Sequence, residues 1–288
     1  MSSPEEGEEK DPTQFPKMTR EMHKVILQSL SMKSTGIIIE EYGIPISKED
    51  LDTLYHWLND EVINFYLNMI MARSKENENL PNVHAFNTFF YDSFSTGGYA
   101  NVKSRTRKID LFSKDILFVP INYKDPRNEH WALAVIRLKK DSVYGPGVYY
   151  YDSLGRENTK VLKDLLNYLE SEHMDKKKKL LDTSDFKLEN VKNIPKQRNG
   201  SDCGVYALKY AEYLSRNASI TFTEKDISYF RQTMVFEIVK NNIINYSNTG
   251  CEVFKRGIQN WKVSKKLLIC SHLPIPPILK VRYFVLVC

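Results

Sequence analysis

The chain contains the segment Gln197-Arg198-Asn199-Gly200-Ser201-Asp202-Cys203-Gly204, a polar turn that leads directly into a helical pattern. The apolar residues that follow have the i, i+3, i+4, i+7 spacing of a helix with one buried face: Ala207, Tyr210, Ala211 and Leu214. A helix N-terminus stabilises negative charge, so a thiol at this position is favoured as thiolate, the form that attacks carbonyl carbons. A buried structural cysteine is the alternative and the commoner role of a free cysteine. The segment by itself leaves both interpretations open.

A histidine and an aspartate upstream lie at the ends of two expected strands. Residues 131–138 and 148–151 are rich in strand-forming side chains, and residues 139–147 carry turn residues, so the sequence predicts a hairpin. In an antiparallel pair the start of the first strand lies beside the end of the second. His130 and Asp152 are therefore expected at the same edge of the sheet, close enough for the imidazole and the carboxylate to meet.

These residue types together suit nucleophilic catalysis. His130 would accept the proton of the Cys203 thiol and later give a proton to a leaving amine, while Asp152 would orient the ring. The backbone N–H of Cys203 and the side-chain amide of Gln197 are candidate donors to the oxyanion that forms. Each residue also has an ordinary structural interpretation, as a strand-end histidine, a turn aspartate or a solvated loop glutamine. Their joint occurrence in this order favours the catalytic one.

Five segments resemble the proteases that act on ubiquitin-like proteins, and most closely the SUMO (sentrin)-specific proteases. They follow the family's order from about Gly36 to Ile244: Trp57-Leu58-Asn59-Asp60-Glu61-Val62-Ile63-Asn64-Phe65-Tyr66, His84-Ala85-Phe86-Asn87-Thr88-Phe89-Phe90, His130-Trp131, Tyr150-Tyr151-Asp152-Ser153-Leu154 and Gln197 to Gly204. The resemblance implies a thiol endopeptidase and isopeptidase that cleaves after the C-terminal Gly-Gly of SUMO, processing the precursor and releasing SUMO from target lysines. It implies SUMO and SUMO conjugates as partners, no cofactor, and residence in the nucleus, with the cytoplasm as an alternative.

The resemblance also implies roles for residues outside the catalytic set. Trp57 and Trp131 resemble the two indoles that enclose the diglycine in a narrow tunnel, which glycine fits because it has no Cβ. Asp60 resembles an acidic contact to the body of the modifier, and Phe89 an aromatic contact on the same docking surface. The alternatives are a core tryptophan, a helix N-terminal charge and a core phenylalanine.

The implied fold is α+β and papain-like, with a helical half packed against a mixed or antiparallel sheet and the catalytic cleft between them. Expected strands are residues 109–112, 116–121, 131–138 and 148–151, and expected helices lie within 51–71, 158–172, after Cys203 and in 224–244. We expect a disordered acidic segment at 1–20, a catalytic domain at 21–245 and an extension of uncertain structure at 246–288.

Two departures from the family pattern affect modifier preference. Ser104-Arg105-Thr106-Arg107 lacks an expected docking tryptophan, and the loop at 122–129, next to His130, is longer than usual. A protease for another ubiquitin-like modifier and a silent SUMO-binding module therefore stay open. A third alternative is an acyltransferase, because some bacterial effectors on the same scaffold transfer acetyl groups. The last group lacks the paired tryptophans.

Composition agrees with a monomeric enzyme from a reducing compartment. The 288 residues carry a net charge of +5, which is too mild to imply nucleic acid as a partner. The four cysteines, at 203, 251, 270 and 288, lack Cys-x-x-Cys spacing, so neither a metal site nor a disulfide framework is expected. We expect no secretory signal and no membrane span, since the prolines and charges near the C-terminus do not suit a spanning helix.

Overall fold

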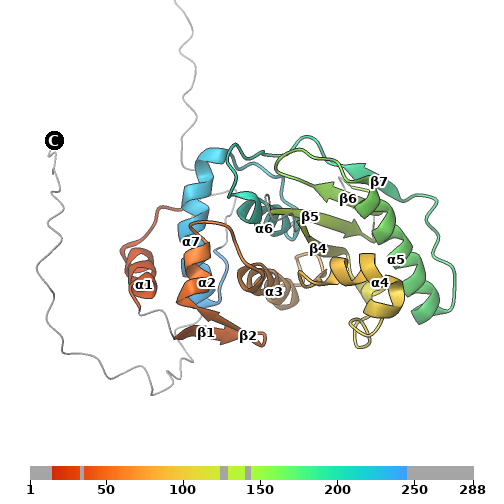
Figure 1. Ribbon diagram of the computed structural model, residues 1–288, viewed down its shortest axis with the longest axis horizontal. Coiled ribbons are helices and arrows are strands. Elements are labelled where there is room, and N and C mark those ends of the chain that lie inside the picture. Colours follow the sequence, from red (N-terminus) through yellow and green to blue (C-terminus); the bar gives the residue numbers. More distant parts are fainter. Residues whose placement is uncertain (1–14, 33–35, 124–128, 140–143, 245–288) are drawn as a thin grey trace, which may run out of the picture. The chain divides into compact units, whose positions relative to one another are not determined.

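The computed structural model describes residues 15–32, 36–123, 129–139 and 144–244 (Figure 1). Its centre is a five-stranded sheet with the order β3-β4-β5-β6-β7. The strands are β3 Val83–Ala85, β4 Ile116–Tyr123, β5 His130–Arg137, β6 Gly147–Tyr151 and β7 Lys187–Asn190. The central strands pair antiparallel and the two edge strands pair parallel, so the sheet is mixed, as predicted.

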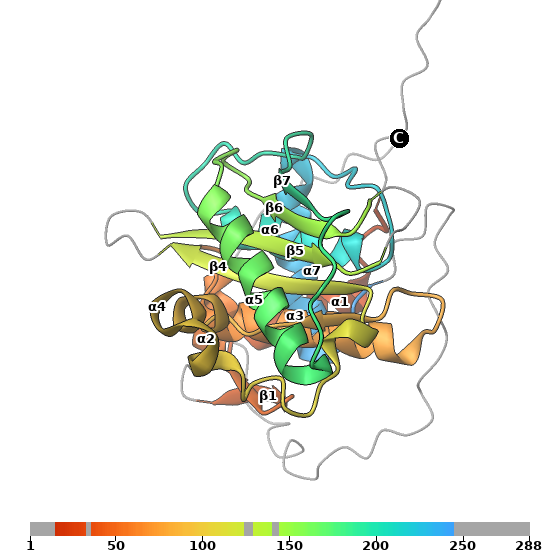
Figure 2. The same cartoon turned by 90° about the vertical axis from the view of Figure 1, so that its right-hand side faces the viewer.

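Helices cover both faces of this sheet, which explains why β4 and β5 are almost continuously apolar. On one face, Ala132 and Ala134 of β5 pack with α4 Phe90–Val102 and α5 Thr159–Lys177. On the other, Leu133 and Val135 pack with the core beneath the remaining helices. Figure 2 shows α5 in front of the sheet, with α6 Cys203–Leu214 and α7 Ile227–Lys240 behind it.

The helical half is built from elements that precede and follow the sheet in sequence. It comprises α1 Arg20–Leu30, the hairpin of β1 Ile37–Glu41 with β2 Ile44–Ser47, α2 Lys48–Thr53, α3 Asp60–Glu76, α6 and α7. Side-chain caps fix where two of these helices begin. Ser47 accepts from the N–H of Asp50 at the start of α2, and Asn59 accepts from the N–H of Val62 at the start of α3.

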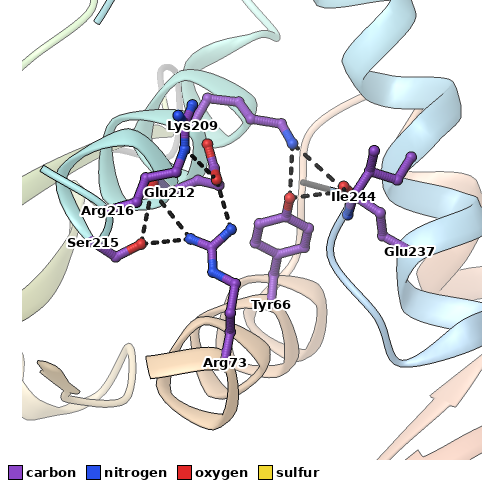
Figure 3. A network of polar contacts seen from close by, with 8 residues as sticks. All are labelled: Tyr66, Arg73, Lys209, Glu212, Ser215, Arg216, Glu237 and Ile244. Carbon is purple, nitrogen blue, oxygen red and sulfur yellow. Dashed lines mark hydrogen bonds and ion pairs between the residues drawn. The ribbon is translucent and has the colours of Figure 1, made fainter. Parts of the chain in front are cut away.

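The helix that follows Cys203 differs from the prediction. The sequence predicts one buried face, yet all residues of α6 are buried, including Lys209 and Glu212. Lys209 Nζ donates to Tyr66 Oη at 2.7 Å and lies 3.5 Å from Glu237 Oε2 (Figure 3). Tyr66 comes from α3 and Glu237 from α7, so this network joins three helices.

A second network binds one oxygen of the buried Glu212 carboxylate, Oε1. Arg73 on α3 donates through Nη1 to Glu212 Oε1 at 2.7 Å, and Arg216 Nε donates to the same oxygen at 2.9 Å (Figure 3). Both cations help to keep the pKa of Glu212 below its ordinary value, against the opposing effect of burial. The spacing of apolar residues predicts only one buried face for α6. It misses the buried polar residues, because their hydrogen-bond partners come from other helices.

The other predicted elements are confirmed at β4, β5, β6, α5 and within α2, α3 and α7, with one exception. Residues 109–112 are not a strand. Leu111–Ser113 forms the 3-10 helix η1, because Asp110 Oδ1 accepts from the N–H of Phe112 at 3.1 Å and bends the chain. A second 3-10 turn, η2 at Glu224–Asp226, precedes α7.

The outer segments fall mainly outside the described residues. The proposed extension at 246–288 lies wholly outside them, as do residues 1–14 of the expected acidic segment and most of the loop at 122–129. Thr19 caps α1, and Phe15 and Met18 before it pack against the core. Among the described helices, none combines the length and apolar character needed to cross a membrane.

Candidate active site

Cys203 is the first residue of α6, where the backbone N–H groups of the helix are still unpaired. Its side chain is packed among apolar groups, and the residue is only 2% exposed. The next residue, Gly204, leaves no room for a side chain. A Cβ on Gly204 would lie 2.9 Å from Leu58 Cβ and 3.3 Å from Trp131 Cδ1, closer than side chains normally approach.

His130 and Asp152 meet at the edge of the sheet, as the hairpin predicted. His130 opens β5 and Asp152 directly follows β6, and both are buried. His130 Nε2 lies 3.0 Å from Asp152 Oδ2. The other ring nitrogen, Nδ1, is therefore available to hydrogen-bond to the Cys203 thiol.

The electrostatics of this pair favour a protonated histidine. Burial lowers the pKa of His130, but hydrogen bonds to Asp152 and to Cys203, with their charges, outweigh burial and raise the pKa to about 9. Burial likewise raises the pKa of Asp152, yet the bond and charge of His130 keep that pKa below its ordinary value. The arrangement therefore supports an imidazolium between the Asp152 carboxylate and the Cys203 sulfur.

The Asp152 carboxylate is held by further donors. The N–H of Leu154 donates to Oδ1 at 2.7 Å, and Tyr150 Oη donates to Oδ2 at 3.4 Å. Tyr150 Oη is 2.6 Å from Tyr123 Oη, which accepts from the side-chain amide of Asn158. Sequence reasoning missed these hydroxyls. The available signal was that Tyr150 and Asp152 are two residues apart at the end of an expected strand, so their side chains share a face.

Gln197 lies close to the residue that follows Asp152. Its backbone N–H donates to the carbonyl of Ser153 at 2.9 Å, and Ser153 Oγ donates to Gln197 Oε1 at 2.5 Å. Gln197 Nε2 donates to the carbonyl of Asn199 at 2.6 Å. Gln197 is buried, so the alternative interpretation as a solvated loop amide does not hold.

The turn before Cys203 is held by its own side chains and by α7. Asn199 Oδ1 accepts from the N–H groups of Ser201 and Asp202, both at 3.0 Å. Arg231 donates to Asp202 Oδ1 from Nε at 3.0 Å and from Nη2 at 2.6 Å. Its Nη1 also donates to the carbonyl of Leu54. One guanidinium thus connects the turn before the cysteine to the segment that leads to Trp57.

The two tryptophans have different environments. Trp131 is 4% exposed and donates through Nε1 to the carbonyl of Leu58 at 2.8 Å. Trp57 is 47% exposed. It borders a pocket of about 380 Å³ whose other lining residues are Glu49, Asp52, Thr53, His56 and Ser201.

Asp60 and Phe89 lie on elements that do not carry the Cys203, His130 or Asp152 side chains. Asp60 is the half-exposed first residue of α3, and Phe89, 46% exposed, directly precedes α4. Arg105 donates to Asn87 Oδ1 at 3.0 Å and to Ser93 Oγ at 2.6 Å. These two acceptor residues lie on either side of Phe89 in the sequence. Within the described residues, no cluster of histidine, cysteine, aspartate and glutamate is suited to hold a metal ion.

Comparison with known families assigns the fold. The model of the Ulp1 protease family, C-terminal catalytic domain, matches residues 56–243. This range includes Cys203, His130, Asp152 and Gln197 as well as both tryptophans. The chain belongs to the Ulp1 protease family. This confirms the resemblance that the sequence segments indicated.

Individual members of the Ulp1 protease family agree with this assignment. The chain is 43% identical to a sentrin-specific protease of Caenorhabditis elegans, over 72% of this chain and 29% of the relative. It is 38% identical to sentrin-specific protease 2 of Homo sapiens, over 79% of this chain and 38% of the relative. The chain therefore spans well under half the length of these relatives.

Solved structures of the Ulp1 protease family share the architecture. The C-terminal Ulp1 protease domain in complex with Smt3, the yeast ortholog of SUMO, superimposes with a TM-score of 0.65 at 28% identity, covering 78% of this chain and 97% of that chain. A SUMO protease Ulp1 with its catalytic cysteine oxidised to a sulfinic acid gives a TM-score of 0.64 at 29% identity, covering 78% of this chain and 97% of that chain. The predicted α+β protease fold is confirmed.

Proposed function

We propose that this chain is a thiol endopeptidase and isopeptidase that cleaves after the C-terminal Gly-Gly of SUMO. Its substrates would be the SUMO precursor and SUMO attached to lysines of target proteins. The observation that carries the proposal is the buried His130–Asp152 pair, 3.0 Å apart, with its imidazole hydrogen-bonded to Cys203 at a helix N-terminus. The names of the relatives and the Smt3 complex of Ulp1 support SUMO as the modifier.

The chemistry follows from the protonation state of the pair. The Cys203 thiolate attacks the carbonyl carbon of the terminal glycine, and the developing oxyanion is stabilised by the N–H of Cys203 and by Gln197 Nε2. The His130 imidazolium gives its proton to the leaving lysine amine, which departs and leaves a thioester. Water, deprotonated by His130, then attacks the thioester and releases the SUMO carboxylate. Asp152 keeps the ring oriented through both steps.

The diglycine would reach the thiol between Trp57 and Trp131. The nearly complete burial of Cys203 supports a narrow approach, since only an extended segment without side chains fits beside a packed indole. Asp60 and Phe89 would contact the body of the modifier, on α3 and beside α4. Their exposure is compatible with that role. Nuclear residence stays a prediction.

Cleavage of a purified SUMO conjugate tests the proposal. Wild-type protein is expected to release SUMO, while Cys203→Ser binds the conjugate with unchanged affinity and releases none. Normal cleavage by Cys203→Ser would rule out the mechanism. Probes with an electrophile at the C-terminus of SUMO, of ubiquitin and of other modifiers distinguish the substrate, because only an accepted modifier labels Cys203. Binding without labelling by any probe would favour a silent module.

A further inference from the structure

We propose that Ser153 is a positioning residue that fixes the orientation of the Gln197 amide, so that Gln197 Nε2 faces the oxyanion. The inference rests on the proposed function, in which Gln197 is an oxyanion donor. It concerns a residue adjacent to Asp152 whose own side chain has no part in the proton transfers. The geometry around the amide carries it.

A glutamine amide has two ends of nearly equal size and opposite hydrogen-bonding character. Only its neighbours determine which end faces which side. Here Gln197 Nε2 lies 2.6 Å from the carbonyl of Asn199, which can only accept a hydrogen bond. The nitrogen must therefore be at this end of the amide, and the oxygen must face Ser153.

Ser153 then acts as the donor at the other end. A hydroxyl can donate or accept, but opposite Gln197 Oε1 it must donate, and the 2.5 Å separation indicates a close bond. A flipped amide would place N–H donors against Ser153 and an oxygen against the Asn199 carbonyl, where two acceptors repel. The Asn199 carbonyl therefore selects which end of the amide is the nitrogen, and the Ser153 hydroxyl holds the oxygen end in place. This orientation leaves the second hydrogen of Nε2 unused by these two partners, as an oxyanion donor requires.

The Ser153–Gln197 connection is rigid because it is double and buried. In addition to the side-chain bond, the carbonyl of Ser153 accepts from the N–H of Gln197 at 2.9 Å. Both residues are buried, so water does not readily replace the hydroxyl. Loss of that hydroxyl alone leaves Gln197 Oε1 without its donor and lets the amide rotate, while the backbone bond still holds the loop.

This arrangement also sets the spacing between two parts of the site. Ser153 directly follows Asp152, and Gln197 lies six residues before Cys203 in the turn that leads to it. Ser153 therefore connects the Asp152 carboxylate, which orients His130, with the Gln197 amide, which would donate a hydrogen bond to the oxyanion. If Ser153 acts through Gln197, its removal should affect oxyanion stabilisation and leave the titration of the His130–Asp152 pair unchanged.

A double-mutant cycle on Ser153 and Gln197 tests the inference in the full chain, with SUMO that carries a fluorogenic amide at its terminal glycine. Ser153→Ala is expected to lower kcat about 10-fold with little change in KM, since only the transition state uses the oriented donor. Gln197→Ala is expected to lower kcat about 100-fold, the usual loss of one oxyanion donor. The double variant should then resemble Gln197→Ala within about 2-fold, because the serine has nothing left to orient.

Three controls separate this role from a general structural one. Ser74→Ala removes another buried hydroxyl that donates to a carbonyl at 2.5 Å, and it should lower the melting temperature without changing kcat. Ser153→Thr keeps a hydroxyl and should recover most of the kcat that Ser153→Ala loses. The pH dependence of kcat/KM should keep its midpoints in Ser153→Ala.

The outcomes also separate the inference from the function on which it rests. If the losses of the two single variants multiply in the double variant, or if Ser153→Ala shifts the pH midpoints, Ser153 acts elsewhere and the inference is wrong while the proposed function stands. If Gln197→Ala keeps full kcat, the oxyanion role of Gln197 is wrong and the inference is wrong with it. Cleavage by Cys203→Ser would instead overturn the proposed function itself.

Discussion

Arg231 on α7 directs two N–H groups at one carboxylate oxygen of Asp202, the residue directly before Cys203. The other oxygen, Oδ2, accepts from Asn199 Nδ2 at 2.6 Å. The same guanidinium donates to the carbonyls of Ser201 and Leu54. A helix remote in sequence therefore holds the turn that presents the cysteine.

Arg231→Met should destabilise the fold and slow catalysis. It leaves the Asp202 carboxylate buried without its cation, and breaking such a pair costs about 3 kcal/mol. Urea unfolding measures this loss, and the matched control is Arg198→Met, whose pair with Glu224 is exposed and contributes under about 1 kcal/mol. Equal losses in the two variants would show that the Arg231–Asp202 pair has no special role in holding the turn.

The pH dependence of activity should follow the raised pKa of His130. With that pKa at about 9, the imidazolium persists through neutral pH, and kcat/KM should fall as the pH rises through about 9. In Asp152→Asn the partner charge is lost, so this basic limb should move to lower pH. A basic limb unmoved by the substitution would mean that Asp152 does not support the charged ring.

The same group connects stability to pH. Because the pKa of folded His130 is about 9 and its ordinary value is 6.5, the folded state holds the proton more tightly between these values. The stabilisation is therefore fully present below pH 6.5 and is lost as the pH rises to about 9. Denaturant unfolding of wild type and Asp152→Asn across this range should show a difference that shrinks with rising pH.

Gly204→Ala should impair the site through one methyl group. That Cβ would press on Leu58 and Trp131, so we expect a loss of about 1–3 kcal/mol in stability and a marked drop in kcat. Gly200→Ala is the control in the same turn, because no atom lies within 4 Å of the Cβ it would add. An active and stable Gly204→Ala would argue that this contact tolerates displacement.

The two tryptophans should respond differently to truncation. Trp57→Ala should lower kcat/KM strongly with little change in melting temperature, since Trp57 is about half exposed. Trp131→Ala should lower kcat/KM and also reduce the free energy of unfolding by about 3–5 kcal/mol. It leaves a cavity in the core and removes the hydrogen bond to the Leu58 carbonyl. Unchanged kcat/KM in Trp57→Ala would remove it from the proposed tunnel.

The sequence by itself determined the elements of the site that depend on local pattern. A polar turn before a helical repeat placed Cys203 at a helix start, and the hairpin pattern brought His130 to Asp152. These predictions succeeded because helix starts and strand ends are set by neighbours in sequence. The failure at residues 109–112 was also local, since a strand-like composition concealed the turn-forming side chain of Asp110.

Tertiary structure decided what surrounds those elements. Lys209 is buried because Tyr66 and Glu237 arrive from other helices, and periodicity cannot register partners so far along the chain. The bond from Ser153 to Gln197 joins residues 44 positions apart. Such pairings form only when packing excludes water and each buried polar group must find a protein partner, so they are a property of the assembled core rather than of any one segment.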